Sequence, residues 1–310
     1  MSFQRAARTD KSVSALGNVV SAKVYIDVKD SIQTLNSNLP KDIKIIGNAI
    51  SNYLINYLIS LNIVWFLMWI NLDIIKTNRA FSSKNCCSSR TYAYTLPTFA
   101  FSNFTEIITD CYRISKEKID LVNKLLSRYK GTKNFHNFTS GKEFDEENAK
   151  RFIMNIQFKL DISEGIEFGT ITIKGQSFML HQIRKMIGFV IAIIRGHLTE
   201  NSFDTVFDKK KMDIPKAPGL GLRLESVNYD AYNVKMKKLS DSIHKEINWD
   251  VYRQQIDNFR NDVLLKHILK VETTERPMMN WLNLIKLNHY GVHDEKEKFT
   301  TIGKACKLIM

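Results

Sequence analysis

The sequence predicts an α+β fold, because strands and helices are interleaved along it without the regular repeat of a parallel sheet. Residues 19–26 and 152–162 alternate between apolar and other side chains, which is the pattern of strands. Residues 178–195 are apolar over most of a helical surface, which is typical of a helix buried against a sheet.

The other predicted elements follow in chain order. Residues 91–96 alternate and end at Pro97, and a turn at 163–165 leads into a strand over 166–174. Ser115 can cap a helix whose apolar stripe stops at Gly131, and a last helix is expected over 250–270. The long alternation at 152–162 predicts a shared face for six apolar side chains: Phe152, Met154, Ile156, Phe158, Leu160 and Ile162.

The chain is basic and has the composition of a globular protein. Its 310 residues include 45 lysines and arginines against 32 acids, a net charge of +13. Such an excess favours a polyanionic partner, either nucleic acid or an anionic membrane surface. The motifs of phosphate-binding loops, dinucleotide folds and zinc deaminases are absent, and the four cysteines have no metal-ligand spacing. No metal site is therefore expected.

One stretch departs from this composition. Residues 45–72 contain no charged side chain, and residues 54–70 are dense in aliphatic and aromatic residues. Length and apolarity make 54–70 a formal transmembrane candidate. The uncharged stretch is interrupted by polar residues, among them Asn52, Asn56, Ser60, Asn62 and Asn71. A buried or interfacial helix and a foreign insertion are therefore the alternatives, and we favour the insertion.

Four groups of residues could carry chemistry. Asp10 lies between cations in Arg8-Thr9-Asp10-Lys11, where a carboxylate stays ionised and can act as a nucleophile or a base. The alternative is an exposed turn with local ion pairs. Arg184 follows His181 by three residues in the apolar helix at 178–195, so its burial requires an anion, for which Asp10 is a candidate. The alternative is an arginine at the helix surface.

The other two groups combine basic and aromatic residues. Arg90, Tyr92 and Tyr94 lie on a predicted strand, where a tyrosine could stack on a nucleobase or simply pack in the core. The turn that begins at Lys130 is also basic and aromatic, and it could face RNA or end a helix.

Six blocks occur in order along residues 5 to about 222: RAARTDKSVSALGNVVS, LPKDIKIIG, SSRTYAYTLPTFAF, YKGTKNFHNFTS, IKGQSFMLHQIRKMIGFVIAIIRG and APGLGL. Together they resemble the TruA-type tRNA pseudouridine synthases, and within them the eukaryotic pseudouridylate synthase 1 branch. Weaker similarity extends into the tail as TTERPMMNWL.

The resemblance implies a role for each matching residue. It implies that Asp10 is the catalytic residue, that Arg184 pairs with it, and that Tyr92 stacks on the uracil and accepts a proton. Arg8 is implied to displace the target nucleotide from its stack. The residues expected to contact RNA are Arg8, Lys11, Arg90, Lys130 and His181.

The resemblance also implies a fold and a reaction. The fold would be two halves, each built on a mainly antiparallel sheet, on either side of a basic RNA-binding cleft. The reaction would isomerise uridine to pseudouridine in tRNA, with other structured RNAs as further substrates and with no cofactor or metal. A homodimer or an extended monomer is expected, in the nucleus, with the mitochondrion and cytoplasm as further locations. A catalytically inactive RNA-binding fragment of the same fold is the alternative.

The resemblance divides the chain into three parts. They are an N-terminal catalytic half (1–104), a second half of the synthase fold (105–227) and a basic C-terminal extension (228–310). Within the first half, the family's first strand is expected to be missing, and residues 48–76 are an insertion between two matching blocks. Ser12 stands where the family pattern has glycine, in a turn expected to need positive φ.

Overall fold

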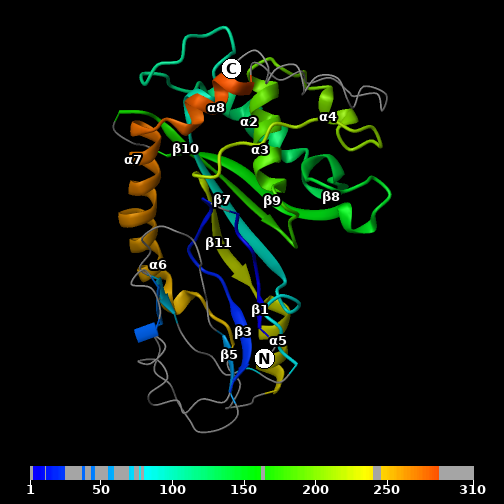
Figure 1. Cartoon of the computed structure of the whole chain (residues 1–310), viewed down its shortest axis with the longest axis vertical. Helices are drawn as coiled ribbons and strands as arrows, with labels where there is room; N and C mark the ends of the chain where they lie inside the picture. Colours follow the sequence, from blue (N-terminus) through cyan, green and yellow to red (C-terminus); the bar gives the residue numbers. More distant parts are fainter. Residues whose placement is uncertain are drawn as a thin grey trace, which may run out of the picture.

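A computed structural model describes most of the chain and confirms the predicted α+β fold (Figure 1). The described residues are 3–10, 12–24, 37–38, 43–45, 55–58, 70–72, 77, 80–161, 165–239 and 246–285. The largest sheet has six strands in the order β2 (Ser14–Ala15), β11 (Leu222–Asn228), β7 (Ser89–Pro97), β10 (Phe168–Gly175), β9 (Lys150–Asp161) and β8 (Gly131–Asn134).

This sheet is mainly antiparallel and joins distant parts of the chain. Strand β10 pairs antiparallel with β7 on one side and β9 on the other, and only β2 runs parallel to its neighbour β11 among these pairs. Strands β2 and β7 belong to the expected N-terminal half, while β8 to β11 belong to the second half. The boundary expected near residue 104 therefore falls between strands of one sheet, and the division into domains stays a prediction.

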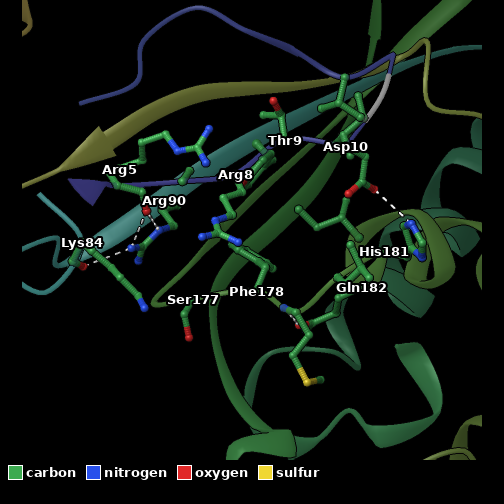
Figure 2. Close-up of a pocket in the computed structure, with 18 of the residues that line it drawn as sticks. Arg5, Arg8, Thr9, Asp10, Lys84, Arg90, Ser177, Phe178, His181 and Gln182 are labelled. Carbon is green, nitrogen blue, oxygen red and sulfur yellow. Dashed lines mark hydrogen bonds and ion pairs between the residues drawn. The ribbon is translucent and has the colours of Figure 1, made fainter. Parts of the chain in front are cut away.

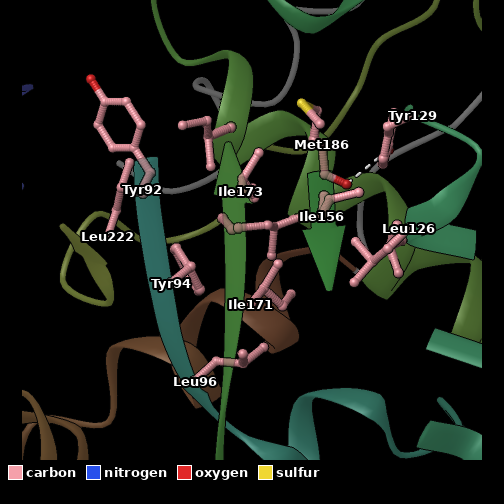
Figure 3. Close-up of a cluster of buried hydrophobic side chains, with 14 of the residues drawn as sticks. Tyr92, Tyr94, Leu96, Leu126, Tyr129, Ile156, Ile171, Ile173, Met186 and Leu222 are labelled. Carbon is pink, nitrogen blue, oxygen red and sulfur yellow. Dashed lines mark hydrogen bonds between the residues drawn. The ribbon is translucent and has the colours of Figure 1, made fainter. Parts of the chain in front are cut away.

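Two helices pack on this sheet and complete its core. Helix α2 (Lys116–Ser127) begins where Ser115 accepts a hydrogen bond from the Lys118 amide, as expected, but it ends before Gly131. The Asn123 side chain fastens it to β9 through both backbone groups of Phe158. Helix α3 (Gln182–Ile194) is almost entirely buried. Figure 3 shows apolar side chains of β7, β9, β10, α2 and α3 meeting in one cluster.

The predicted phase of the strand at 152–162 is wrong at its first half. The buried side chains are Ile153, Ile156 and Phe158, whereas Phe152, Met154 and also Leu160 are exposed. Ile162 lies outside the described residues. A register shift opposite Lys174 and Gly175 explains the change, since the extra residue of a β-bulge inverts the side-chain alternation.

The other described strands form two smaller sheets. Strand β3 (Val20–Val24) pairs antiparallel with both β1 (Gln4–Arg5) and β5 (Ile55–Leu58), and β4 (Ile43–Ile45) pairs with β6 (Ile70–Leu72). The segment 55–58 is thus a strand rather than part of the helix considered for the uncharged stretch. The rest of 48–76, apart from 70–72, lies outside the described residues. Within the described parts of the chain, no helix has the length and apolarity needed to span a membrane.

The C-terminal extension is helical where it is described. After α5 (Asp230–Leu239), the expected helix at 250–270 appears as consecutive helical segments: η4 (Asp250–Tyr252), α6 (Arg253–Phe259), η5 (Arg260–Leu265) and α7 (Lys266–Thr274). Helix α8 (Pro277–Ile285) follows a turn at Arg276, whose guanidinium forms a bidentate pair with Asp110. This pair anchors the extension to the loop before α2.

Candidate active site

Asp10 lies on a short segment that passes from the three-stranded sheet to the six-stranded sheet. Upstream, Asn18 holds the backbone of Ala7 through both its side-chain oxygen and its amide nitrogen. Downstream, the Val13 amide donates to the carbonyl oxygen of Asp10, and Ser12 adopts the positive φ of 68° expected at that turn. Asp10 is therefore fixed between two anchored pieces of backbone.

Two side chains from the start of α3 approach the Asp10 carboxylate. His181 Nε2 lies 3.5 Å from Asp10 Oδ2, and Arg184 Nη1 lies 3.7 Å from the same oxygen. The Arg184 side chain is only 13% exposed, and its Nε donates to the Ala217 carbonyl at 2.7 Å. The structure thus brings Arg184 and Asp10 together from positions 174 residues apart in the sequence.

The start of α3 differs from the sequence prediction. The helix was expected from residue 178, with His181 on the same helical face as Arg184. Instead α3 begins at Gln182, and His181 is its N-cap in the left-handed conformation, with φ 61° and ψ 0°. Leu180, expected on the apolar face of the helix, precedes it and is 57% exposed.

Asp10 lies in a cavity of about 990 Å³ whose charged lining residues are mostly cationic (Figure 2). Among the described residues that line it, Asp10 is the only carboxylate. Five lysines and arginines contribute to the same wall: Arg5, Arg8, Lys84, Arg90 and Arg151. A cavity with this charge suits a polyanionic ligand, and its volume suits a ligand of nucleotide size.

Tyr92 forms part of the apolar end of this cavity. Its ring meets the Phe178 ring edge to face, with the centroids 5.2 Å apart. Burial raises the pKa of Tyr92 to about 12, with Arg90 opposing the shift. A phenol with this pKa stays protonated at neutral pH, so Tyr92 is a poor proton acceptor there, and its predicted stacking role stays a prediction.

Arg90 is occupied by the fold. Its guanidinium donates to the carbonyl oxygens of Ala6, Lys84 and Gln176. It therefore clamps the end of β1 against the loop before β7 and the turn after β10. The sequence assigned Arg90 to RNA contact, but these bonds give it a structural task in the wall of the cavity.

The other predicted RNA contacts differ in position. Arg8 lines the cavity and is exposed. Lys130 is exposed after the end of α2 but does not line the cavity. Lys11 lies outside the described residues. Tyr94 is buried, and its hydroxyl donates to the Pro218 carbonyl, so it packs rather than faces the cavity.

Sequence reasoning missed several residues of the cavity wall. Arg5, Lys84, Arg151 and Phe178 come from four separate segments, and no spacing in the sequence connects them. Arg5 and Phe178 carried a usable signal, because each lies in a matching block, five residues before Asp10 and three residues before His181 respectively. Arg151 has a buried Nε without a hydrogen-bond partner among the described residues, a feature visible only in the structure.

The comparison with known families matches the segment that supplies one side of this site. Residues 125–230 match the model of the tRNA pseudouridine synthase family, a segment that contains α3 with His181 and Arg184. Residues 125–230 of the chain therefore form a domain of the tRNA pseudouridine synthase family.

Individual relatives extend the similarity over nearly the whole chain. The chain is 40% identical to the pseudouridylate synthase 1 homolog of Mus musculus and 39% identical to that of Homo sapiens. Each alignment spans 293 residues, which covers 94% of this chain and 62% of the relative. The chain is 31% identical to tRNA pseudouridine synthase 1 of Kluyveromyces lactis over 86% of this chain and 56% of that protein. The chain thus spans about three fifths of the length of these relatives.

Proposed function

We propose that the chain is an RNA pseudouridine synthase that isomerises uridine to pseudouridine in tRNA, with Asp10 as the catalytic carboxylate. The observation that carries the proposal is the position of Asp10, which pairs with Arg184 and is the one carboxylate among the described residues that line a cavity with five lysines and arginines. The names of the relatives, which include tRNA pseudouridine synthase 1, support tRNA as the substrate.

The reaction breaks the N1–C1′ bond of uridine, turns the uracil, and forms a C5–C1′ bond. C5 then loses its proton and N1 gains one, so that atoms and electrons balance without a redox or phosphate step. Asp10 would act as the nucleophile at the sugar or as a base that assists cleavage. Arg184 would hold the carboxylate in place and balance its negative charge.

The cavity wall would supply the other two requirements of this reaction. The target nucleotide must leave its stack, and Arg5, Arg8 and Lys84 offer charges for the phosphates on either side of it. The uracil must turn in place, and the rings of Tyr92 and Phe178 offer an apolar surface for its face.

The proposal includes the cellular setting. We infer a nuclear enzyme that acts on tRNA and on other structured RNAs, with the mitochondrion and cytoplasm as further locations. A homodimer is the proposed assembly. The proposed reaction chemistry uses side chains of the protein and requires no cofactor.

The test is pseudouridine mapping on a uridine-containing tRNA transcript incubated with the full chain, beside filter binding to the same transcript. The proposal predicts binding and formation of pseudouridine. Binding without any pseudouridine over a range of tRNA substrates would contradict it and would favour the inactive RNA-binding protein of the same fold.

A further inference from the structure

The two partners of Asp10 use the same carboxylate oxygen. His181 Nε2 and Arg184 Nη1 both approach Oδ2, at 3.5 and 3.7 Å. Among the described residues, no hydrogen bond or ion pair is made to Oδ1. The carboxylate is therefore held by one oxygen, and the other oxygen stays available to a ligand in the cavity.

The backbone of His181 is strained in a way that serves this contact. A left-handed conformation is unfavourable for a non-glycine residue, and such strain often occurs at functional sites. Only three non-glycine residues have positive φ in the described parts of the chain: Ser12, His181 and Arg276. Two of these three adjoin Asp10, one in its own turn and one in contact with its carboxylate.

The surroundings of His181 keep its ring uncharged at neutral pH. Burial lowers the pKa of His181 first, and the nearby cations Arg184, Lys185 and Lys216 lower it further, while Asp10 opposes them. An uncharged ring can donate its Nε2–H to Oδ2 and fix the orientation of the carboxylate. It adds no second full charge beside Arg184, which would weaken Asp10 as a nucleophile or a base.

We propose that His181 is a positioning residue that, together with Arg184, holds Asp10 through Oδ2 and directs Oδ1 toward the nucleotide. The role differs from the RNA contact expected from the sequence. It rests on the proposed function, since it assigns His181 a task in the step that Asp10 performs. Mispositioning a reacting group by about 1 Å typically costs on the order of 100-fold in rate.

Two substitutions separate the positioning role from other roles. His181→Ala removes the donor, and we expect the single-turnover rate of pseudouridine formation to fall about 10- to 100-fold, with the Kd for tRNA changed less than about twofold. His181→Gln places an amide N–H in a similar position, so it should recover most of the rate. His267→Gln on α7, away from the cavity, is the matched control and should behave as the wild type.

The dependence of the reaction rate on pH separates the positioning role from a purely structural role, which would leave this dependence unchanged. The wild-type rate should fall as the pH drops through the lowered pKa of His181, because the charge on the protonated ring stabilises the Asp10 carboxylate against reaction. His181→Gln has no group to protonate and should keep a flat profile between pH 5 and 8 relative to the wild type.

Each other outcome overturns the inference. An unchanged rate in His181→Ala, or a His181→Gln variant as slow as His181→Ala, would show that donation to Oδ2 is not what His181 supplies. A raised Kd with an unchanged rate would restore the RNA-contact role. If the wild type itself forms no pseudouridine, the proposed function fails first, which distinguishes its failure from that of the positioning role.

Discussion

Arg90 donates from both Nε and Nη2 to the carbonyl oxygen of Ala6, at 3.0 and 2.8 Å. This forked contact joins β7 to the segment that leads to Asp10, four residues further along the chain. A planar guanidinium can satisfy several carbonyl groups at once, which a lysine ammonium cannot do with the same geometry. Arg90 therefore fixes the wall on which Asp10 depends.

Replacement of Arg90 should reduce stability before it affects RNA binding. In Arg90→Ala, the carbonyl groups of Ala6, Gln176 and Lys84 lose their donor, and we expect a loss of about 2 kcal/mol in the free energy of unfolding. Arg90→Lys should recover only part of this. Urea unfolding measures both values. The control Lys84→Ala also removes one positive charge from the cavity wall but leaves its backbone carbonyl in place, so it should retain wild-type stability.

Some of these relationships could be predicted from the sequence, and others could not. The strands at 91–96 and 166–174 could be predicted because the alternation of their side chains is a local pattern. The pairing of Arg184 with Asp10 could be predicted because burying an unpaired charge is costly. The bulge in β9 could not be predicted, because it depends on the partner strand. The clamp made by Arg90 was missed for the same reason, since its acceptors are backbone groups brought together only by the fold.

Ser12 offers a test of the strain beside Asp10. Its φ of 68° favours glycine, so Ser12→Gly should relieve a backbone cost of roughly 1–2 kcal/mol. The greater freedom of glycine in the unfolded chain offsets about half of this, leaving a gain of about 0.5–1 kcal/mol. Ser12→Ala keeps the strain and should bring no gain. Equal stability of the glycine and alanine variants in thermal unfolding would argue against strain at this turn.

Glu272 should make the stability of the chain depend on pH. Burial raises its pKa from 4.5 to about 7, while the Met278 amide, which donates to its Oε1, opposes the shift. Because the folded state binds the proton more tightly, this stabilisation is complete below pH 4.5 and is lost as the pH rises through about 7. The loss is at most about 3 kcal/mol.

The Glu272→Gln variant isolates this effect. Glutamine keeps an oxygen for the Met278 amide but cannot ionise, so the variant should be more stable than the wild type at pH 8 and closely similar to it at pH 4.5. Chemical unfolding at both pH values provides the comparison. If the difference in stability between the wild type and the variant is the same at both pH values, Glu272 is not buried in its neutral form.

The affinity for tRNA should fall steeply with salt. With a net charge of +13 and a cationic cavity, binding should release several counterions, and the logarithm of the binding constant should decrease linearly with the logarithm of the salt concentration. Arg5→Ala should weaken binding and reduce the slope, whereas Lys159→Ala on β9, outside the cavity wall, should change the slope less. A flat salt dependence would count against an RNA partner.

The role of Asp10 is tested most directly by Asp10→Asn, which keeps the shape of the side chain and removes its charge. The site predicts that the single-turnover rate of pseudouridine formation in tRNA falls by at least about 1,000-fold, which corresponds to about 4 kcal/mol in the barrier. Binding of tRNA should persist, because Arg5, Arg8 and Lys84 remain. Arg184→Ala should also slow the reaction severely. If Asp10→Asn retains most of the wild-type rate while binding tRNA normally, the assignment of Asp10 as the catalytic residue is wrong.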